Sequence, residues 1–317
     1  MDEKDGAFGT PEQHAAHYLA LAEEIWPETF STRREAAYDR LDREYGHLCQ
    51  SLSYLIERGD GERAERMLRV LRDFWWARCR LLEGREWIAR VFAALRFTPF
   101  SITRAAVLDH AGALAFAMSD HDAARKCFEE SLAIRRKIGT KPEVASSLHH
   151  LANVIRWGHG DTELARVLLE ECLAHVRGTE DRVMTGAALM PLGALAVERG
   201  DIDLAHTLLA EGIAIFAAVQ LTMGFPLSLQ EFAALAAVEG QPGRALRLFG
   251  AGAKQHERLA TIQLPYIRAW VEGYAAIARQ ALSKEDVDAA WAEGQALSLE
   301  QAIAYALGER TVDRPER

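Results

Sequence analysis

The residues of this sequence best suited to chemistry are arginines that recur at every third position of one segment. Arg63, Arg66, Arg69 and Arg72 stand in GERAERMLRVLRD, and this spacing places their guanidinium groups across about half of a helix surface. Guanidinium groups bind carboxylates and phosphates in a forked geometry, so one interpretation is a patch for an anion or an acidic partner. The interpretation that we favour is a solvated helix face whose arginine stems cover apolar surface.

Histidines and serines show no catalytic or metal-binding pattern. His14 and His17 are three residues apart and His149 and His150 are adjacent, whereas a zinc site needs three or four converging ligands. We therefore expect no metal site, and we expect His110 and His150 to form hydrogen bonds at helix contacts. No G-x-S-x-G turn and no G-x-x-x-x-G-K-[ST] phosphate loop occurs. The sequence predicts a protein that is not an enzyme and holds no cofactor.

Composition and charge narrow the class of protein further. The 317 residues are 49% hydrophobic, which is enough for a buried core and too apolar for a disordered chain. The net charge of −9 argues against direct nucleic acid binding, because that depends on Lys and Arg neutralising phosphates. The cysteines lack C-x-x-C spacing, the N-terminus MDEKDGAFGT is acidic, and no apolar stretch reaches membrane-spanning length. We expect a cytoplasmic protein with no membrane contact.

The elements that must position these residues repeat along the chain. Four segments match position by position at an interval of about 40 residues: 119–132, 160–173, 200–213 and 240–253. In each, a small residue is followed four residues later by a large one and three residues after that by another small one, as in Ala205, Leu209 and Gly212. The segment before each match has a second register, as in Leu189, Leu192 and Gly193. These spacings are helical, so each repeat is predicted to be an antiparallel helix pair.

The repeat register predicts the organisation of the whole chain. A small residue at a helix crossing lets two backbones approach while its large neighbour fills the adjacent groove. We predict helix pairs at 61–79/83–96, 102–118/121–137, 142–157/161–177, 181–199/202–218 and 223–239/242–258. Further helices are predicted near 11–26, 32–43 and 44–58 before these pairs and near 263–280, 284–293 and 298–306 after them. The expected organisation is one continuous domain with a helical cap at 1–59, five repeats at 60–260, and a helical cap with a loose tail at 261–317.

The order Leu-x-x-[large]-Gly/Ala, followed by Ala-x-x-x-Phe/Leu, resembles the tetratricopeptide repeat. The flanking segments HAAHYLALAEEIWPE, FWWARCRLLEGREWIARVFAAL and WAEGQALSLEQAIAYALG extend the resemblance over about residues 12–308. They are similar to the C-terminal sensor region of bacterial signal-transducing ATPase transcriptional regulators of the LuxR type and the antibiotic-regulator type. This resemblance implies an all-α fold, a right-handed superhelix of helix pairs with helical caps. It also implies a ligand- or protein-binding sensor module; the alternative is a stand-alone scaffold or adaptor.

In tetratricopeptide superhelices the first helix of each pair lines a concave groove that binds peptides or small ligands. By this resemblance the groove would be lined by Arg66, Arg69, Asp73, Trp76, Asp109, Phe116, His149, Asn153, Arg156, Trp157, Met190, Glu198 and Gln230. The implied partner is an effector peptide, a small molecule or a partner protein domain, and a homodimer is a further possibility. Aromatic side chains beside charged and amide groups suit a site that encloses and orients a ligand. The alternative is the ordinary wet inner face of any superhelix.

Pro191 interrupts the pattern of the fourth pair. It stands in LMPLGALAVERG, where the other copies have no proline. A proline inside a helix removes one hydrogen bond and clashes with the preceding turn, typically costing about 3 kcal/mol. Either a helix begins at Pro191, or one helix spans 181–199 and bends. We expect the continuous bent helix, because Val183, Ala187 and Met190 share one helical register.

Overall fold

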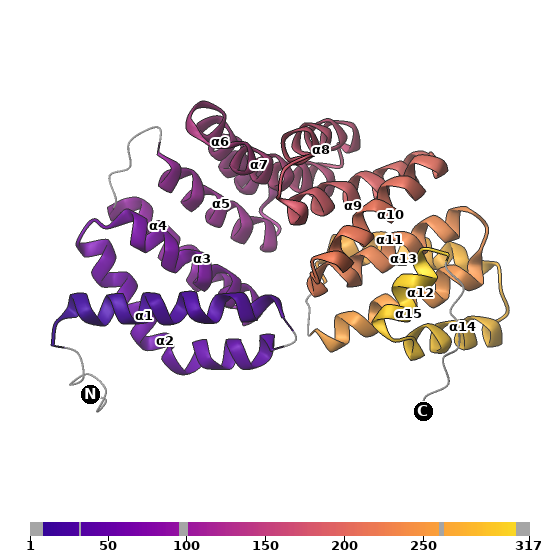
Figure 1. Cartoon of the computed structure of the whole chain (residues 1–317), viewed down its shortest axis with the longest axis horizontal. Coiled ribbons are helices and arrows are strands. Elements are labelled where there is room, and N and C mark those ends of the chain that lie inside the picture. The colour runs from indigo at the N-terminus through magenta and orange to yellow at the C-terminus, as the bar shows by residue number, and fades with distance from the viewer. Residues whose placement is uncertain (1–8, 32, 95–100, 260–262, 309–317) are drawn as a thin grey trace. The chain divides into compact units, whose positions relative to one another are not determined.

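The computed structural model describes residues 9–31, 33–94, 101–259 and 263–308. Every regular element in these ranges is a helix and none is a β-strand, which confirms the predicted all-α class. The chain divides into two compact units, residues 1–161 (unit 1) and 162–317 (unit 2), and Figure 1 labels their helices. The boundary falls inside the third predicted pair. The loose tail and the last residues of the first predicted pair, 95 and 96, lie outside the described residues.

Unit 1 consists of consecutive helices. Its α-helices are α1 (Pro11–Ile25), α2 (Arg34–Glu57), α3 (Gly61–Ala77), α4 (Leu81–Ala94), α5 (Ile102–Ala117), α6 (His121–Ile138) and α7 (Lys141–Val154). A 3-10 turn, η2 (Trp26–Phe30), follows α1, and a π-helical turn, η3 (Ile155–His159), follows α7. Apart from α2, these helices agree with the prediction to within a few residues at each end.

The helix α2 corrects the prediction of two helices near 32–43 and 44–58. It is continuous, because Leu41, Leu48, Leu52 and Leu55 keep one buried helical stripe across the expected break. It runs antiparallel to α1, so that Glu12 near the start of α1 contacts Tyr54 and Glu24 near its end contacts Arg40. The predicted N-terminal cap therefore contains one further antiparallel helix pair.

Unit 2 has the same local construction. Its α-helices are α8 (Thr162–Val176), α9 (Arg182–Arg199), α10 (Ile202–Ala218), α11 (Phe225–Val238), α12 (Pro242–Arg258), α13 (Pro265–Gln280), α14 (Lys284–Ala296) and α15 (Leu299–Ala306). A short 3-10 turn, η4 (Thr222–Gly224), precedes α11. Every helix predicted in this part of the chain is present, and α9 runs without a break through Pro191. The alternative of a helix that begins at Pro191 is therefore wrong.

Close helix crossings explain the small residues of the repeat. A Cβ added to Gly112 on α5 would lie 2.8 Å from the Phe128 ring of α6, and one added to Gly193 on α9 would lie 2.6 Å from Leu209 of α10. Such distances are too short for a side chain, so glycine is what allows the two helices of a pair to approach. Phe128 and Leu209 are almost fully buried. The predicted alternation of small and large residues at the crossing is confirmed.

Turns between helices share one backbone device. Gly59, Gly160, Gly200 and Gly240 have positive φ angles between 70° and 75°, and Ser119 adopts φ 62° at the equivalent place. A left-handed residue there ends one helix and directs the chain into the next. The residue that follows is often aspartate, and its side chain caps the new helix, as at Asp60, Asp120 and Asp201. At Gly59-Asp60 and Gly200-Asp201 the glycine thus ends one helix and the aspartate caps the next.

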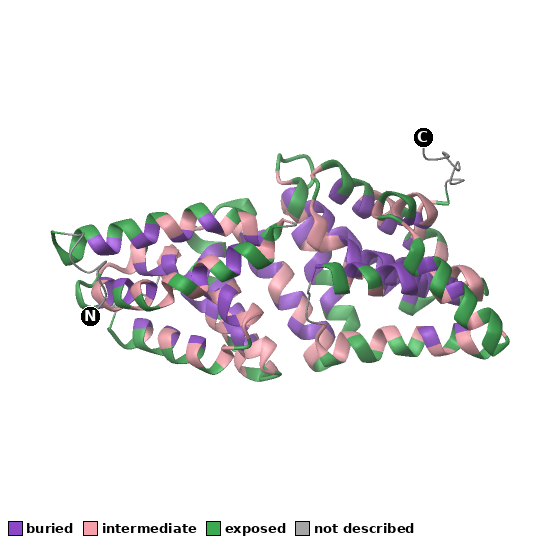
Figure 2. Ribbon diagram, turned by 90° about the horizontal axis from the view of Figure 1, so that it is seen from below, coloured by how far each residue is buried: buried purple, intermediate pink, exposed green. Residues whose placement is uncertain are grey.

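Apolar side chains form a core within each unit. In unit 1 the largest cluster gathers residues of α1 to α5, with Trp75, Phe74 and Leu71 fully buried. In unit 2 the largest cluster gathers residues of α9 to α15 around Leu209 and Phe249. Figure 2 shows these buried positions as purple stripes along the helices. Among the described helices, none is long and apolar enough to cross a membrane.

Candidate functional site

The four arginines of α3 are all engaged by carboxylates. Arg63 contacts Glu12 of α1 at 2.5 Å and Asp60 at 2.6 Å. Arg66 forms a forked pair with Glu23 of α1, with both nitrogen–oxygen distances at 2.7 Å. The arginine run therefore fastens α1 to α3, rather than presenting unpaired cations to an anion. The interpretation that we favoured, a solvated face, did not include these ion pairs between helices.

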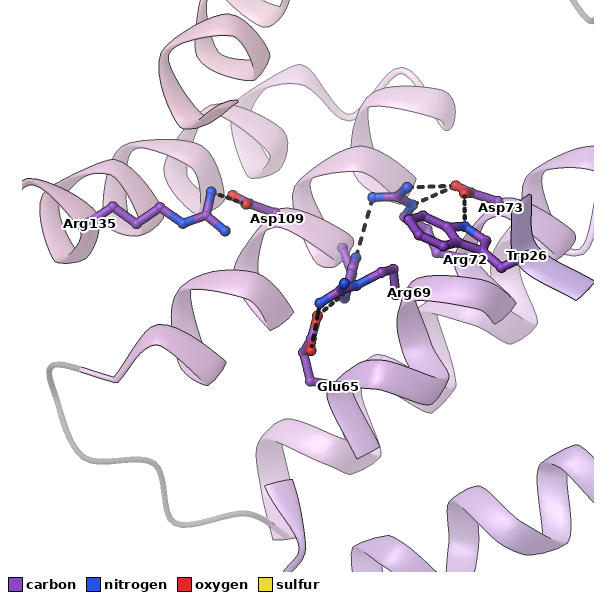
Figure 3. Close-up of polar contacts among 8 residues, drawn as sticks. Trp26, Glu65, Arg69, Arg72, Asp73, Asp109 and Arg135 are labelled. Carbon is purple, nitrogen blue, oxygen red and sulfur yellow. Dashed lines mark hydrogen bonds and ion pairs between the residues drawn. The ribbon is translucent and has the colours of Figure 1, made fainter. Parts of the chain in front are cut away.

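The arginines further along α3 contribute to a network at its junction with η2. Arg72 donates to Asp73 Oδ1 from two nitrogens, at 2.6 and 2.9 Å. The Trp26 indole of η2 donates to Asp73 Oδ2 at 3.2 Å. Figure 3 shows these contacts beside Arg69 and Glu65. Asp73 was predicted to face a ligand, but both of its oxygens are occupied by neighbours in the same unit.

His110 of α5 continues this network into the interior. Its Nε2 lies 3.2 Å from Glu65 Oε1, and its Nδ1 lies 3.4 Å from an Arg72 nitrogen. Arg69 donates to both oxygens of Glu65 and lies over the Trp26 ring, 5.9 Å from its centre. These contacts form a closed ring of side chains. We call this set the polar ring; its six members are Trp26, Asp73, Arg72, His110, Glu65 and Arg69.

Burial sets the protonation of the polar ring. His110 is only 4% exposed, and burial lowers the pKa of its imidazole although the hydrogen bond to Glu65 opposes this shift. Burial acts to raise the pKa of Glu65, but its contacts with His110 and Arg69 outweigh burial and leave that pKa lowered. The ring therefore holds a neutral imidazole between one arginine and one carboxylate. The expectation that His110 is hydrogen-bonded at a helix contact is confirmed.

A second buried charged pair joins α5 to α6. Arg135 lies 2.5 Å from Asp109 Oδ2 and donates to Ser147 Oγ of α7 at 2.8 Å. Burial raises the pKa of Asp109, and the charge of Arg135 opposes that rise. Asp109 Oδ1 and Arg135 Nε have no hydrogen-bond partner among the described residues. Asp109 was predicted to line a groove, but it is 5% exposed and acts inside the unit.

His150 lies beside these groups on α7. Its ring stacks on Phe128 at 5.2 Å between ring centres, with 22° between the planes. Burial lowers the pKa of His150 to about 3, and the charges of Arg72 and Arg135 act in the same direction. Its Nδ1 has no hydrogen-bond partner within the described part of the chain. His150 is thus a half-buried neutral ring that stacks on Phe128, and the predicted hydrogen bond is not formed at Nδ1.

Five predicted groove residues of unit 1 are partly buried and lie outside the contacts of the α3 arginines and the polar ring. They lie on α3, α5, α7 and the π-helical turn that follows α7: Trp76, Phe116, His149, Asn153 and Trp157. Asn153 Nδ2 lies 3.2 Å from His149 Nε2 and donates to its carbonyl at 3.0 Å, so the two side chains are held together. Trp157 lies under the Arg156 guanidinium at 4.2 Å from the ring centre. Arg156 itself is only 6% exposed.

The predicted groove residues of unit 2 are either buried or paired. Met190 is 4% exposed and packs against Gly212 of α10 in the core. Gln230 is 3% exposed and accepts a hydrogen bond from Gln263 at 2.9 Å. Glu198 accepts from the Trp270 indole of α13 at 2.8 Å. These side chains were expected to face a ligand, but α10, α13 and the segment before α13 contact them instead.

Unit 2 also contains a small apolar hollow. It has a volume of about 190 Å³ and is bordered by α8, α9 and α10, with Leu173, Leu192 and Leu208 among its lining residues. Leu204 at its edge is 45% exposed. No pattern in the sequence pointed to this hollow. Across the described ranges, no group of three or more His, Cys, Asp and Glu side chains is arranged to hold a metal ion.

No pattern in the sequence pointed to Glu65 or Arg135, and Arg72 was considered only as part of the arginine run, although the sequence contained a signal for its different role. Arg72 occupies the position at which later copies have Gly112 or Ala152. This departure from the repeat is explained by the polar ring, in which Arg72 contacts His110. For Glu65 and Arg135 the sequence contains no comparable signal, because their partners lie 45 and 26 residues away at positions with no fixed spacing.

Comparison with known proteins agrees with the geometry of the repeats. A tetratricopeptide repeat model matches residues 103–178. Proteins of Mycobacterium bovis and Mycobacterium tuberculosis, provisionally named as HTH-type transcriptional regulators, are 31% identical to this chain over 195 residues. That match covers 60% of this chain and 21% of each relative, so the chain spans about a fifth of their length.

Among solved structures, a Rap protein complexed with Competence and Sporulation Factor has a similar fold. The TM-score is 0.55 with 13% sequence identity, and the match covers 92% of this chain and 96% of the Rap chain. At this identity the likeness concerns the fold alone. The chain thus contains tetratricopeptide repeats in residues 103–178, shares its helical fold with Rap, and is related in sequence to proteins named as transcriptional regulators.

Proposed function

We propose that this chain is a ligand- or partner-sensing region of a bacterial transcriptional regulator and that it performs no catalysis itself. The observation that carries the proposal is the 31% identity, over 195 residues, to proteins named as HTH-type transcriptional regulators. Because the chain spans only about a fifth of those relatives, the DNA-binding activity that their name implies is assigned to other parts of such a protein. Its helix pairs supply a surface for recognition.

The recognition surface that we propose consists of five partly buried residues of unit 1: Trp76, Phe116, His149, Asn153 and Trp157. Aromatic rings beside an imidazole and an amide suit recognition of a peptide or a small molecule with an apolar body and a few polar groups. The Rap protein of similar fold was solved with Competence and Sporulation Factor, which supports an effector as the occupant. The α3 arginines are left out of this surface, since carboxylates already engage them.

Native mass spectrometry of the purified chain tests the proposal. We expect either a retained small species that denaturation releases or a stable complex with an added effector. The double variant Asn153→Ala/Trp157→Ala should lose that species. The variant Ile277→Ala, which shortens an exposed apolar side chain of α13, should keep it. Retention that is equal in both variants would exclude the proposed surface. A stable complex with a protein and no effector would favour the scaffold or adaptor function.

A DNA-binding measurement tests independently whether this chain itself binds DNA. We expect the chain to show no tight binding to duplex DNA at physiological salt, because its net charge is −9 and phosphate contacts dominate such binding. Fluorescence anisotropy of a labelled duplex is the measurement. A Kd below about 1 µM at that salt concentration, tighter than typical non-specific binding, would contradict the proposed role.

A further inference from the structure

The polar ring determines the position of one proton. Arginine has only N–H donors, so His110 Nδ1 must accept the hydrogen bond from Arg72. The single ring proton of the neutral imidazole is then on Nε2, where it is donated to Glu65. Arg69 and Arg72 balance the charges of Glu65 and Asp73, so the ring carries no net charge while His110 is neutral. One imidazole thereby connects α5 to α3, which in turn holds η2.

Protonation of His110 is incompatible with this arrangement. A proton from solvent would bind Nδ1 and convert an acceptor into a second N–H donor that faces the Arg72 donor. The hydrogen bond from Arg72 would be lost, and an added positive charge would lie in a site that is 4% exposed. The contact with Glu65 would remain, because Nε2 keeps its proton. Protonation therefore breaks one side of the connection and not the other.

The neighbours of His110 offer limited compensation for an added charge. From α3 it faces Glu65 and Arg72, and on α5 itself Asp109 is adjacent. Asp109 is already paired with Arg135 of α6, and His150 of α7 is a neutral residue within the influence of both Arg72 and Arg135. The buried residues of α4 are Gly84, Ile88 and Val91, which carry no charge. Glu65 favours the imidazolium most directly, and the charge of Asp109 adds a smaller contribution in the same direction.

We propose that the polar ring is a proton-operated latch that holds η2 and α3 on α5 when His110 is neutral and loosens this contact when His110 is protonated. This device is independent of the proposed sensor function. It gives unit 1 a state in which α3 and α5 separate more readily, and that state becomes more populated in acid. The consequence is local, because the six side chains all belong to η2, α3 and α5.

The first test identifies the tautomer of His110. The full chain with ¹⁵N-labelled histidine is examined at pH 7 by long-range ¹H–¹⁵N correlation, and the variant His110→Gln assigns the signal by its disappearance. We expect an Nε2–H imidazole with an unprotonated Nδ1. An Nδ1–H tautomer would overturn the latch, since Arg72 could not then donate to that nitrogen.

The second test measures opening of the contact. Hydrogen exchange of η2, α3 and α5 amides is followed at pH 7.0 and 5.5, with exchange times scaled for the intrinsic pH effect. Wild-type protection should fall by up to about tenfold, the factor for one pH unit below an ordinary histidine pKa near 6.5. The variant His110→Gln retains one acceptor and one donor but does not titrate in this range, and its protection should change much less.

Two further variants complete the design. Arg72→Met removes the donor that competes with a proton on His110 Nδ1. Amide protection in this variant should therefore depend on pH less than in the wild type. This variant also provides the test if His110→Gln fails to fold. His206→Gln changes a partly exposed histidine of unit 2 and should leave the wild-type pH effect intact. A pH effect of wild-type size in His110→Gln, or in Arg72→Met if that is the variant that folds, would show that the polar ring is a static contact and not a latch.

Discussion

At the scale of single residues, burial of polar groups is the dominant feature of unit 1. Asp109, His110 and Arg135 are each less than 9% exposed; Asp109 pairs with Arg135, and His110 contacts Glu65 and Arg72 of α3. A buried ion pair is costly to break on one side, because the remaining charge is left uncompensated in a medium of low polarity. These buried groups therefore stabilise the packing of α3, α5, α6 and α7, and they include Asp109, which was expected to line a groove.

His150 makes stability depend on pH. The pKa of His150 is about 3 in the folded chain and about 6.5 when it is unfolded. Between these values the unfolded state binds a proton that the folded state does not, so stability falls as the pH falls. From pH 7 to pH 5 we expect this residue to cost about 2 kcal/mol of unfolding free energy. Urea unfolding of the wild type and of His150→Gln should differ by that amount in pH dependence. Equal dependence in both would contradict the burial of a neutral ring.

A second residue-scale prediction concerns the helix crossing at Gly112. The variant Gly112→Ala should destabilise the chain by about 1–3 kcal/mol, since its Cβ would overlap the buried Phe128 ring. Gly46→Ala in α2 is the matched control, because nothing lies within 4 Å of its added Cβ. Alanine should there raise stability by about 0.5–1 kcal/mol through its higher helix propensity. Urea unfolding measures both, and equal changes would show that the crossing is not close.

At this scale the sequence predicted which residues pack and not which residues pair. The positions of Ala205 and Leu209 follow from a repeat, because identical crossings require identical residue sizes. The partners of Arg66 and Asp73 do not, because Glu23 and Trp26 lie in a segment outside the repeat register. A positional comparison with the tetratricopeptide consensus therefore placed both residues in a groove. In the structure Arg66 pairs with Glu23 of α1, and Asp73 accepts a hydrogen bond from Trp26 of η2.

At the scale of elements, the turns between helices depend on one left-handed residue. Ser119 adopts φ 62° where most equivalent turns have glycine. A residue with a Cβ is strained there by about 1–2 kcal/mol. The amide of Asp120 still closes the turn by donating to Ala115 O at 2.9 Å, so the strained conformation is held in place.

The variant Ser119→Gly should therefore raise the free energy of unfolding by up to about 1 kcal/mol. The strain energy that glycine removes is larger than the entropic stabilisation that it gives to the unfolded chain. Gly200→Ala, at φ 75° in the corresponding turn of unit 2, should lower it by a similar amount. Thermal or urea unfolding of the two variants provides the measurement. A loss of stability in Ser119→Gly would mean that the serine side chain contributes more than its backbone strain costs.

Helices were predictable because their beginnings and ends have local signals. Gly200 and Asp201 end α9 and cap α10, and both residues are visible in the sequence. The single error in the described helices, the division of α2, arose in a segment outside the repeats. There no repeat register fixed the helix boundaries, while the buried leucines continue one stripe across the expected break. Pro191 shows the converse, since neighbouring helical residues outweigh one unfavourable residue in α9.

At the scale of the whole molecule, the sequence predicted the class of fold and its repeated construction, but not the division into two compact units. A repeat register is the same on both sides of residue 161, so it contains no information about where contacts become sparse. The third predicted pair was therefore treated like the others. In the structure its first helix, α7, belongs to unit 1 and its second, α8, belongs to unit 2.

The separate apolar clusters of the two units have a consequence for cooperativity. Each large cluster lies within one unit, so loss of one leaves the internal contacts of the other in place. Stacked repeats gain stability from near neighbours, and long arrays depart from all-or-none melting. Calorimetry should therefore record a total enthalpy larger than the van't Hoff enthalpy. Leu71→Ala should lower the melting temperature of one component and Leu209→Ala that of the other, each variant losing about 2–5 kcal/mol. A single transition shifted equally by both variants would mean that the whole chain unfolds as one cooperative unit. Two separate transitions would mean that one unit can remain folded while the other unfolds.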